Sequence, residues 1–212
     1  MLPTVKSPSQ NSVPRRRGFS WRALRLPGWI GTIGIVLFAR SSLADHYEVP
    51  SGSMMPTVRV GDHVLVSKVA YGLRVPFVGY VDQFRGPSRA DVVVLESPES
   101  GIVLLKRVIA VPGDTVAVRG GRLWLNGTDI ATEANHGELR ELLGRAHSIS
   151  LEDGGGPNFG PITIPSGKYL VLGDNRGDSR DGRYFGLVER RAIFGRALRV
   201  YWREGKPAWR EL

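Results

Sequence analysis

Val49-Pro50-Ser51-Gly52-Ser53-Met54-Met55-Pro56-Thr57 is the stretch around which the rest of this chain is organised. Two serines flank one glycine, and a proline stands on each side of them. Each proline restricts its own φ angle and pushes the preceding residue toward extended geometry. Glycine lets the backbone approach a ligand closely. The stretch is therefore suited to hold a serine hydroxyl in a tight, open turn, although the same composition is also typical of an ordinary turn.

The charge of the chain is concentrated at its N-terminus. The 212 residues carry a formal charge of +9, which by itself invites a nucleic-acid partner. However, residues 1–40 contain only basic charged residues, so the remainder of the chain is nearly neutral. We therefore expect no nucleic-acid partner. The absence of cysteine excludes disulfides, Cys-ligated zinc and a thiol nucleophile.

The N-terminal segment has the composition of a tail followed by a membrane-targeting region. Residues 1–25 combine Pro, Ser and Arg without hydrophobic periodicity, which predicts a mobile basic tail. Residues 26–44 are mostly apolar, but their apolar run Trp29–Ala39 is shorter than the roughly 20 residues that span a bilayer. Three glycines in this region disfavour a buried core helix.

Two interpretations of residues 26–44 remain open. A cleavable signal peptide would end at Ser42-Leu43-Ala44, where small residues occupy the two expected positions. An uncleaved single-pass anchor would direct Arg40 to the far interface of the membrane. In both cases the preceding arginines place the tail in the cytoplasm and the rest of the chain across the membrane.

Strand-type runs separated by Pro, Gly, Ser or Asp follow the serine stretch. The expected strands are Val58–Val60, His63–Lys68, Asp91–Leu95, Val103–Val111, Thr115–Val118, Arg122–Leu125, Pro161–Ile164, Lys168–Leu172 and Ala192–Trp202. Asn126-Gly127 predicts a hairpin turn. Residues 131–148 are predicted to hold one short helix, with Leu139, Leu142 and Leu143 on one face.

These patterns predict a mainly β protein with a curled or barrel-like antiparallel core. We expect residues 45–118 and 165–212 to form that core, and residues 119–164 to form a smaller inserted β-containing subdomain. The anchor at 26–44 is the expected membrane helix.

Lys106 stands inside the apolar run Leu104–Val111. An edge-strand lysine that points to water is the common reason for such a pattern. The alternative is a desolvated ammonium whose pKa falls far enough for the amine to act as a base. Lowering a lysine pKa by 2–3 units requires about 3–4 kcal/mol of differential destabilisation of the ammonium.

The polar segment Gly173–Arg183 is the third notable stretch. An ordinary solvated loop explains its Asp, Asn and Ser content. A calcium loop is excluded because Arg176 and Gly182 fall where oxygen ligands belong. His63, ten residues after Ser53, is interpreted as an ordinary strand residue rather than as the histidine of a catalytic triad.

Taken together, these stretches resemble the type I signal peptidase family, the membrane-bound serine proteases that remove signal peptides. Pro50–Thr57 resembles the serine box of that family, and Gly61–Val66 resembles the strand box that follows it. Lys106–Asp114 resembles the lysine box, and Gly173–Arg183 resembles the last box. The boxes occur in family order and cover most of residues 47–198.

The resemblance implies a role for three residues in the reaction. Ser53 matches the nucleophile, and Lys106 matches the general base that removes its proton. Ser51 matches the serine whose hydroxyl completes the oxyanion hole together with the Ser53 backbone N–H. Serine–lysine pairs are an established variant of the serine–histidine arrangement.

Four further residues match supporting positions. Ser179 matches the hydroxyl that orients the lysine. Asp181 and Arg183 match an ion pair, and Arg107 is expected beside them. The chain departs from the common family pattern at Gly182, where many members have serine, and at Ala110, where many have glycine.

The resemblance thus implies an endopeptidase of the bacterial cytoplasmic membrane, with one membrane pass, a cytoplasmic N-terminus and an extracytoplasmic catalytic domain. Its expected partners are membrane lipid and preproteins with small residues at the first and third positions before the cut. No cofactor or metal is implied. The alternatives are a maturation peptidase devoted to one conjugation or pilus substrate, and an exported β domain without activity. A self-cleaving repressor is disfavoured because residues 1–44 contain no helix-turn-helix pattern.

Overall fold

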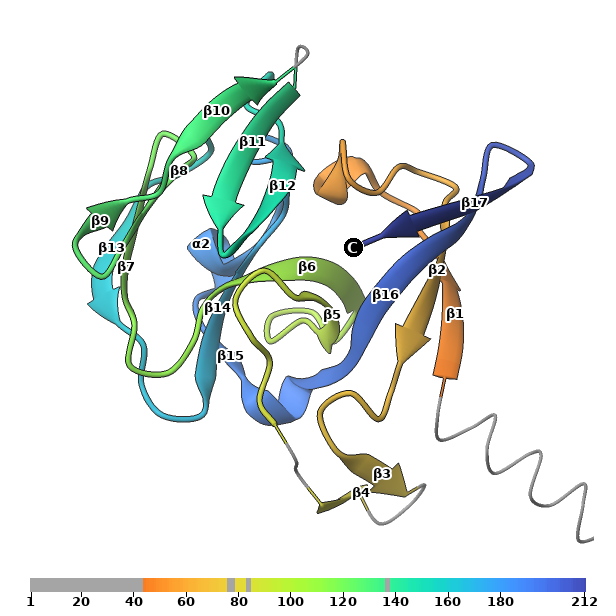
Figure 1. The fold of residues 1–212 in the computed structure, drawn as a ribbon. Coiled ribbons are helices and arrows are strands. Elements are labelled where there is room, and N and C mark those ends of the chain that lie inside the picture. The colour runs from red at the N-terminus through yellow and green to blue at the C-terminus, as the bar shows by residue number, and fades with distance from the viewer. Residues whose placement is uncertain (1–43, 76–78, 83–84, 136–137) are drawn as a thin grey trace, which may run out of the picture. The chain divides into compact units, whose positions relative to one another are not determined.

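Figure 1 presents a computed structural model of the protein. It describes residues 44–75, 79–82, 85–135 and 138–212. The tail predicted at residues 1–25 and the anchor predicted at 26–44 lie outside the described residues, except for Ala44, which begins strand β1. Within the described ranges, no helix has the length and apolar character required to cross a membrane.

The largest sheet carries the serine stretch and the lysine strand. Its eight strands follow the order β1-β2-β16-β5-β6-β14-β15, and β17 pairs with β16. Its strands are β1 (Ala44–Glu48), β2 (His63–Ser67), β5 (Val92–Glu96), β6 (Val103–Ala110), β14 (Lys168–Leu172), β15 (Val188–Glu189), β16 (Ile193–Arg203) and β17 (Lys206–Glu211). All of these pairs are antiparallel.

The mainly β, antiparallel prediction is therefore confirmed, but the barrel part of it is wrong. The order of strands runs from β1 at one edge to β15 at the other, so the sheet does not close. Register shifts interrupt the pairing of β16 with each of its neighbours β2, β5 and β17. Such irregularities bend a strand, which curls the sheet without joining its edges.

Two smaller sheets lie between β6 and β14 in the chain and form the left-hand part of Figure 1. The four-stranded sheet contains β7 (Thr115–Arg119), β8 (Arg122–Leu125), β9 (Thr128–Asp129) and β13 (Phe159–Thr163). The three-stranded sheet contains β10 (Thr132–Asn135), β11 (Glu138–Leu143) and β12 (Arg145–Ile149). The boundaries predicted for the inserted subdomain, 119 and 164, stay a prediction.

The remaining described elements are short. They are the hairpin of β3 (Leu73–Val75) and β4 (Gly79–Asp82), the 3₁₀ turns η2 (Gly52–Met54) and η3 (Arg190–Ala192), and the helix α2 (Gly182–Phe185). The predicted strand Val58–Val60 is instead part of the turn that leads to β2. Asn126 and Gly127 adopt φ angles of 52° and 81°, which confirms the hairpin turn between β8 and β9.

The helix predicted within residues 131–148 is wrong, because the segment forms β10, β11 and β12. Leu143 is 2% exposed and its neighbour Leu142 is 40% exposed, so the two side chains lie on opposite faces of β11. Gly144, the single residue between β11 and β12, has a φ angle of +74°, which permits the tight turn between these strands. Tertiary packing of the alternate residues Glu141 and Leu143 outweighs the helical propensity of the leucines.

The core explains why β5 is a continuous apolar run. Val92 and Val94 belong to one cluster of buried side chains, and Val93 and Leu95 belong to another. Alternate residues of a strand point to opposite faces of the sheet, so both faces of β5 are covered. This double burial holds the neighbouring strand β6, with Lys106, deep in the molecule.

The β11 correction leads to a stability test with an internal control. We expect Leu143→Ala to lower the free energy of unfolding by about 2–5 kcal/mol, because it opens a cavity in the core. Leu142→Ala, one residue away in the same strand, should change it by less than about 1 kcal/mol. Chemical unfolding of both variants measures the difference. Equal losses would contradict the strand assignment.

Candidate active site

The buried side chain of Met54 attaches the serine turn to the hydrophobic core. Ser51 is extended, and the chain then makes the 3₁₀ turn η2, closed by a hydrogen bond from the Met55 N–H to the Gly52 carbonyl at 2.9 Å. Met54 is buried in the cluster that also contains Val64, Val66 and Val94. Because Met54 points inward, the adjacent Ser53 side chain is held at the half-buried surface of the turn.

Lys106 reaches Ser53 from the neighbouring part of the main sheet. It lies opposite Val93 in the pairing of β5 with β6, and only 3% of its surface is exposed. Its Nζ donates a hydrogen bond to Ser53 Oγ at 2.6 Å. The structure thus brings together the two residues that the sequence selected as nucleophile and base.

The surroundings of Lys106 favour its neutral form. Burial is the main cause and lowers the pKa of the amine to about 8. The negative charges of Asp181 and Asp174 act in the opposite direction, and Arg183 assists the lowering. Within the described part of the chain, no carboxylate lies within ion-pair distance of Lys106.

Arg107, the next residue on β6, neutralises one of those carboxylates. Its Nε and Nη2 donate to the two oxygens of Asp174 at 2.8 and 2.7 Å, and Thr57 Oγ1 donates to the same carboxylate at 2.6 Å. Burial by itself raises the pKa of Asp174, but Arg107 outweighs it and holds that pKa below its ordinary value. The position of Arg107 beside the Asp181–Arg183 pair stays a prediction, and its own ion-pair partner is Asp174.

The predicted ion pair between Asp181 and Arg183 is present and buried. Arg183 Nε and Nη2 donate to the Asp181 carboxylate at 2.8 and 2.7 Å. The same carboxylate accepts the Gly173 N–H at 3.0 Å and caps helix α2 through the Arg183 N–H. Asp181 therefore fixes both ends of the loop that faces Lys106.

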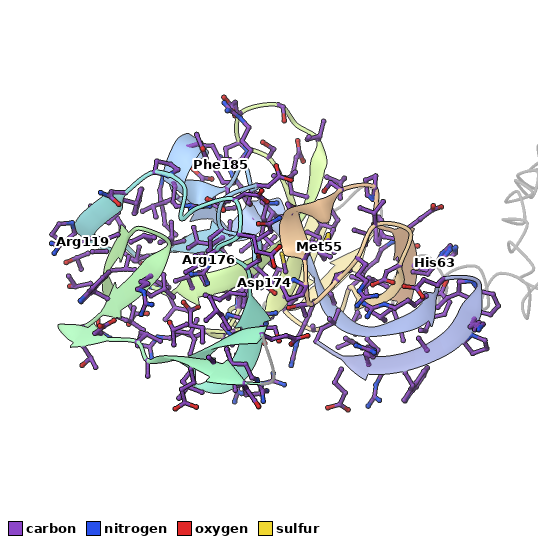
Figure 2. All side chains as sticks on the ribbon, turned by 90° about the horizontal axis from the view of Figure 1, so that it is seen from above. Met55, His63, Arg119, Asp174, Arg176 and Phe185 are labelled. Atoms are coloured by element: carbon purple, nitrogen blue, oxygen red, sulfur yellow. The ribbon has the colours of Figure 1, made fainter. Side chains whose placement is uncertain are left out.

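Sequence reasoning missed a third buried pair. Arg176 donates to both oxygens of Glu141 at 3.0 and 2.6 Å, and His147 Nε2 lies 3.2 Å from Glu141 Oε1. Burial raises the pKa of Glu141, but Arg176 and His147 together hold it below its ordinary value. In the sequence, Glu141 lies between Arg140 and Leu142, and Arg176 lies in the polar segment Gly173–Arg183, so neither stretch pointed to this pair. Figure 2 shows Asp174 and Arg176 in the interior, next to the turn that carries Met55.

Ser179 lies in the site but does not make the predicted contact. Its Oγ is buried and has no hydrogen-bond partner among the described residues, so the expected bond to Lys106 is absent. A Cβ added to Gly173 would lie 2.2 Å from Ser179 Oγ and 2.4 Å from the Ser53 carbonyl oxygen. Ser179 thus packs beside the Ser53 backbone, and the lysine amine is directed to Ser53 Oγ instead. Only glycine fits between them.

The other two candidate residues occupy different positions relative to Ser53. Ser51 is exposed, and its Oγ lies 3.5 Å from Ser53 Oγ. His63 lies in β2, with its ring 5.9 Å from that of Tyr201. Among the residues that the structure describes, the hydroxyl of Ser53 is bonded by Lys106 and not by a histidine.

An apolar cleft of about 220 Å³ opens beside the pair. Its wall consists largely of Val49, Met54, Val64, Val66, Val94 and Leu105, and its polar groups include Ser51, Ser53 and Lys106. The cleft is thus an apolar hollow that opens directly beside the reacting pair.

A serine hydroxyl bonded by a buried lysine, at the edge of an apolar cleft in a β fold, is the arrangement of a serine hydrolase. The family model for signal peptidase, peptidase S26, matches residues 25–202. Signal peptidase I of Pseudomonas aeruginosa is 38% identical over 193 residues, covering 79% of this chain and 68% of that protein.

Two other relatives agree. Signal peptidase I of Pseudomonas fluorescens is 36% identical over 200 residues, with 81% of this chain and 70% of that protein covered. Signal peptidase I of Leptolyngbya laminosa is 32% identical over 185 residues, with 82% and 78% covered. The chain therefore belongs to the signal peptidase family, peptidase S26, and is a serine peptidase.

The burial of Lys106 predicts a pH-dependent cost to stability. Its folded pKa of about 8 lies below the unfolded value of roughly 10.4. The unfolded chain therefore binds more protons between these values, and stability rises with pH there. We expect Lys106→Met to be more stable than the native protein by roughly 3 kcal/mol at pH 7. This advantage should shrink as the pH rises from about 8 toward 10.

Chemical unfolding at pH 7 and pH 10 measures the effect. Lys168→Met serves as the control, because the Lys168 side chain is 43% exposed and lies at a 4.0 Å contact with Glu189. That variant should change stability little at either pH. If Lys106→Met is no more stable than the native protein at pH 7, burial of the Lys106 ammonium does not destabilise the fold, and the prediction is wrong.

Proposed function

We propose that this protein removes signal peptides from exported preproteins, with Ser53 as nucleophile and Lys106 as general base. The observation that carries the proposal is the 2.6 Å contact between Lys106 Nζ and Ser53 Oγ, made by a buried lysine with a lowered pKa. The relatives named Signal peptidase I support the substrate class.

The reaction follows from the protonation state of the lysine. Neutral Lys106 takes the proton of Ser53 as the hydroxyl attacks the carbonyl carbon of the scissile bond. The ammonium then gives a proton to the leaving nitrogen, the C–N bond breaks, and an acyl-enzyme remains on Ser53. Lys106 next takes a proton from water as the water oxygen attacks the ester carbon. The ammonium returns that proton to Ser53 Oγ as the C–Oγ bond breaks, and the signal peptide is released with a free carboxyl group. Side chains and water are sufficient, so no cofactor is required.

The oxyanion that forms in each step needs hydrogen-bond donors. Ser53 N–H and the Ser51 hydroxyl are the groups we assign to this role. Ser51 is exposed next to Ser53 and therefore accessible to a substrate carbonyl oxygen. Asp181, Arg183 and Arg107 act as positioning residues, because their buried ion pairs fix the loop that faces Lys106 against the strand that carries it. Ser179 acts as a positioning residue through its packing beside the Ser53 backbone.

The substrate is an extended preprotein segment that lies against the serine stretch as an added strand. The apolar cleft accepts its small side chains at the first and third positions before the cut. We further propose that residues 26–44 anchor the protein once in the bacterial cytoplasmic membrane, in contact with lipid. The tail 1–25 would then be cytoplasmic and the catalytic β domain extracytoplasmic.

The nucleophile and base are tested by preprotein cleavage in detergent. Ser53→Ala should abolish cleavage, and Lys106→Arg should be as inactive as Lys106→Ala, because arginine does not deprotonate in the working range. Ser51→Ala should retain a rate about 10²–10³ lower than that of the native protein. Ser166→Ala and Lys168→Arg, in the turn before β14 and at its start, are the controls and should keep full activity. An active Lys106→Arg variant would refute the proposed base.

The lowered pKa of Lys106 also predicts the pH profile. Only the neutral amine accepts the serine proton, so kcat/KM should rise with pH through about 8 and then level off. Because Asp178 is one of the charges that raise this pKa, Asp178→Asn should move the midpoint to lower pH. A profile that falls across this range, or that is unmoved by Asp178→Asn, would contradict the assignment.

A further inference from the structure

A second groove borders the serine turn on the side away from the apolar cleft. The cleft is lined by Ser51, Ser53 and Met54, whereas this groove is lined by Gly52, Met55 and Pro56 of the same turn. The two hollows share no lining residue. The far wall of the groove comes from β11, β12 and the chain after them, which Figure 1 shows beside the turn. A polypeptide that crosses Ser53 therefore has a place to lie on each side of it.

The groove is acidic. Four carboxylates line it, from Glu138, Glu152, Asp153 and Asp178. All four residues are exposed, and none makes an ion pair with another described residue, although Glu138 accepts a hydrogen bond from Ser148. Within the described residues, no group of acids is close enough together to hold a metal ion. The charges are thus arranged along a surface and not around one point.

Asn175 supplies an independent sign of a ligand. Asn175 is only 7% exposed and lines the groove. Its Oδ1 atom is buried and has no hydrogen-bond partner in the described structure. The backbone N–H of Asn175 donates to the Ser53 carbonyl oxygen at 3.1 Å, so the residue lies beside the catalytic turn. A buried acceptor without a donor is costly unless a bound molecule provides one.

We propose that this groove binds the part of the preprotein that follows the scissile bond, and that it selects basic over acidic residues there. The inference rests on the proposed function. A turn of the Asn175 amide toward the groove presents its unpaired Oδ1 to a backbone N–H of that segment, and the carboxylates attract the segment's positive charges.

The direction of binding follows from the chemistry of the two hollows. The apolar cleft suits the small side chains before the cut, whereas a polar groove suits the start of an exported protein. Cleavage also creates a new α-amine, which is largely cationic at neutral pH and lies at the beginning of the released segment. An acidic groove beside Ser53 stabilises that product end and disfavours a substrate with acidic residues at the same place.

The test uses the full-length protein in detergent and preproteins that differ only in the residues just after the cut. The native protein should cleave a substrate with two lysines there with a kcat/KM about tenfold above that for two glutamates, and high salt should reduce this ratio. The double variant Glu152→Gln/Asp153→Asn should bring the ratio close to one. Asp129→Asn, an exposed acid in β9, should leave the ratio unchanged. Asp178 is kept because its charge also acts on Lys106.

Asn175 is tested by the length of the substrate. Asn175→Ala should lower kcat/KM by about tenfold on a preprotein. It should change kcat/KM little on a signal-peptide ester that has no residues after the scissile bond. An equal loss on both substrates would mean that Asn175 only supports the turn. If Asn175→Ala does not fold, the groove proposal is tested by the double variant alone, through its ratio of kcat/KM for the two-lysine and two-glutamate substrates.

The outcomes separate the two proposals. If the native protein cleaves both preproteins with equal kcat/KM, the groove proposal is refuted and the proposed function stands. If the native protein cleaves neither the preproteins nor the ester, the proposed function fails and the groove proposal falls with it.

Discussion

The burial of the Lys106 amine beside Ser53 is the constraint on which the rest of the site depends. A lysine residue that is 3% exposed loses most of the hydration of its amine, and this loss lowers the amine pKa to about 8. The negative charges of nearby Asp174 and Asp181 oppose that effect. Each is bound by its own arginine, so the field that reaches the amine is weakened.

Three buried ion pairs of the described structure therefore involve residues of the loop Gly173–Arg183: Asp174 with Arg107, Arg176 with Glu141, and Asp181 with Arg183. These pairs need not stabilise the fold, because desolvation offsets much of their attraction. They instead restrict how the loop lies against β6 and β11. The loop also reaches the catalytic turn directly, through the Asn175 N–H to the Ser53 carbonyl oxygen. The same loop thus sets the charges around Lys106 and helps to position Ser53.

Much of the site could be read from local sequence. Ser53 stands between prolines, and Lys106 interrupts an apolar strand, so each residue is unusual within its own stretch. The partners of two buried arginines were not readable in this way, because Arg107 meets Asp174 across 67 positions of the chain and Arg176 meets Glu141 across 35. Glu141 was further hidden by the helical spacing of the leucines around it.

The sequence by itself determined the mainly antiparallel β character, most of the strands of the main sheet, and the serine and lysine that meet in the site. These features depend on the alternation of apolar and polar residues, on turn residues and on motifs, all of which lie within short stretches of sequence. Only the tertiary structure decided that the sheet stays open and that β11 is a strand. It also decided that Ser179 Oγ packs beside the Ser53 backbone without a hydrogen bond to the lysine. The reason is physical: strand register, buried ion pairs and desolvation arise from residues far apart in the chain, and no local pattern specifies how they meet.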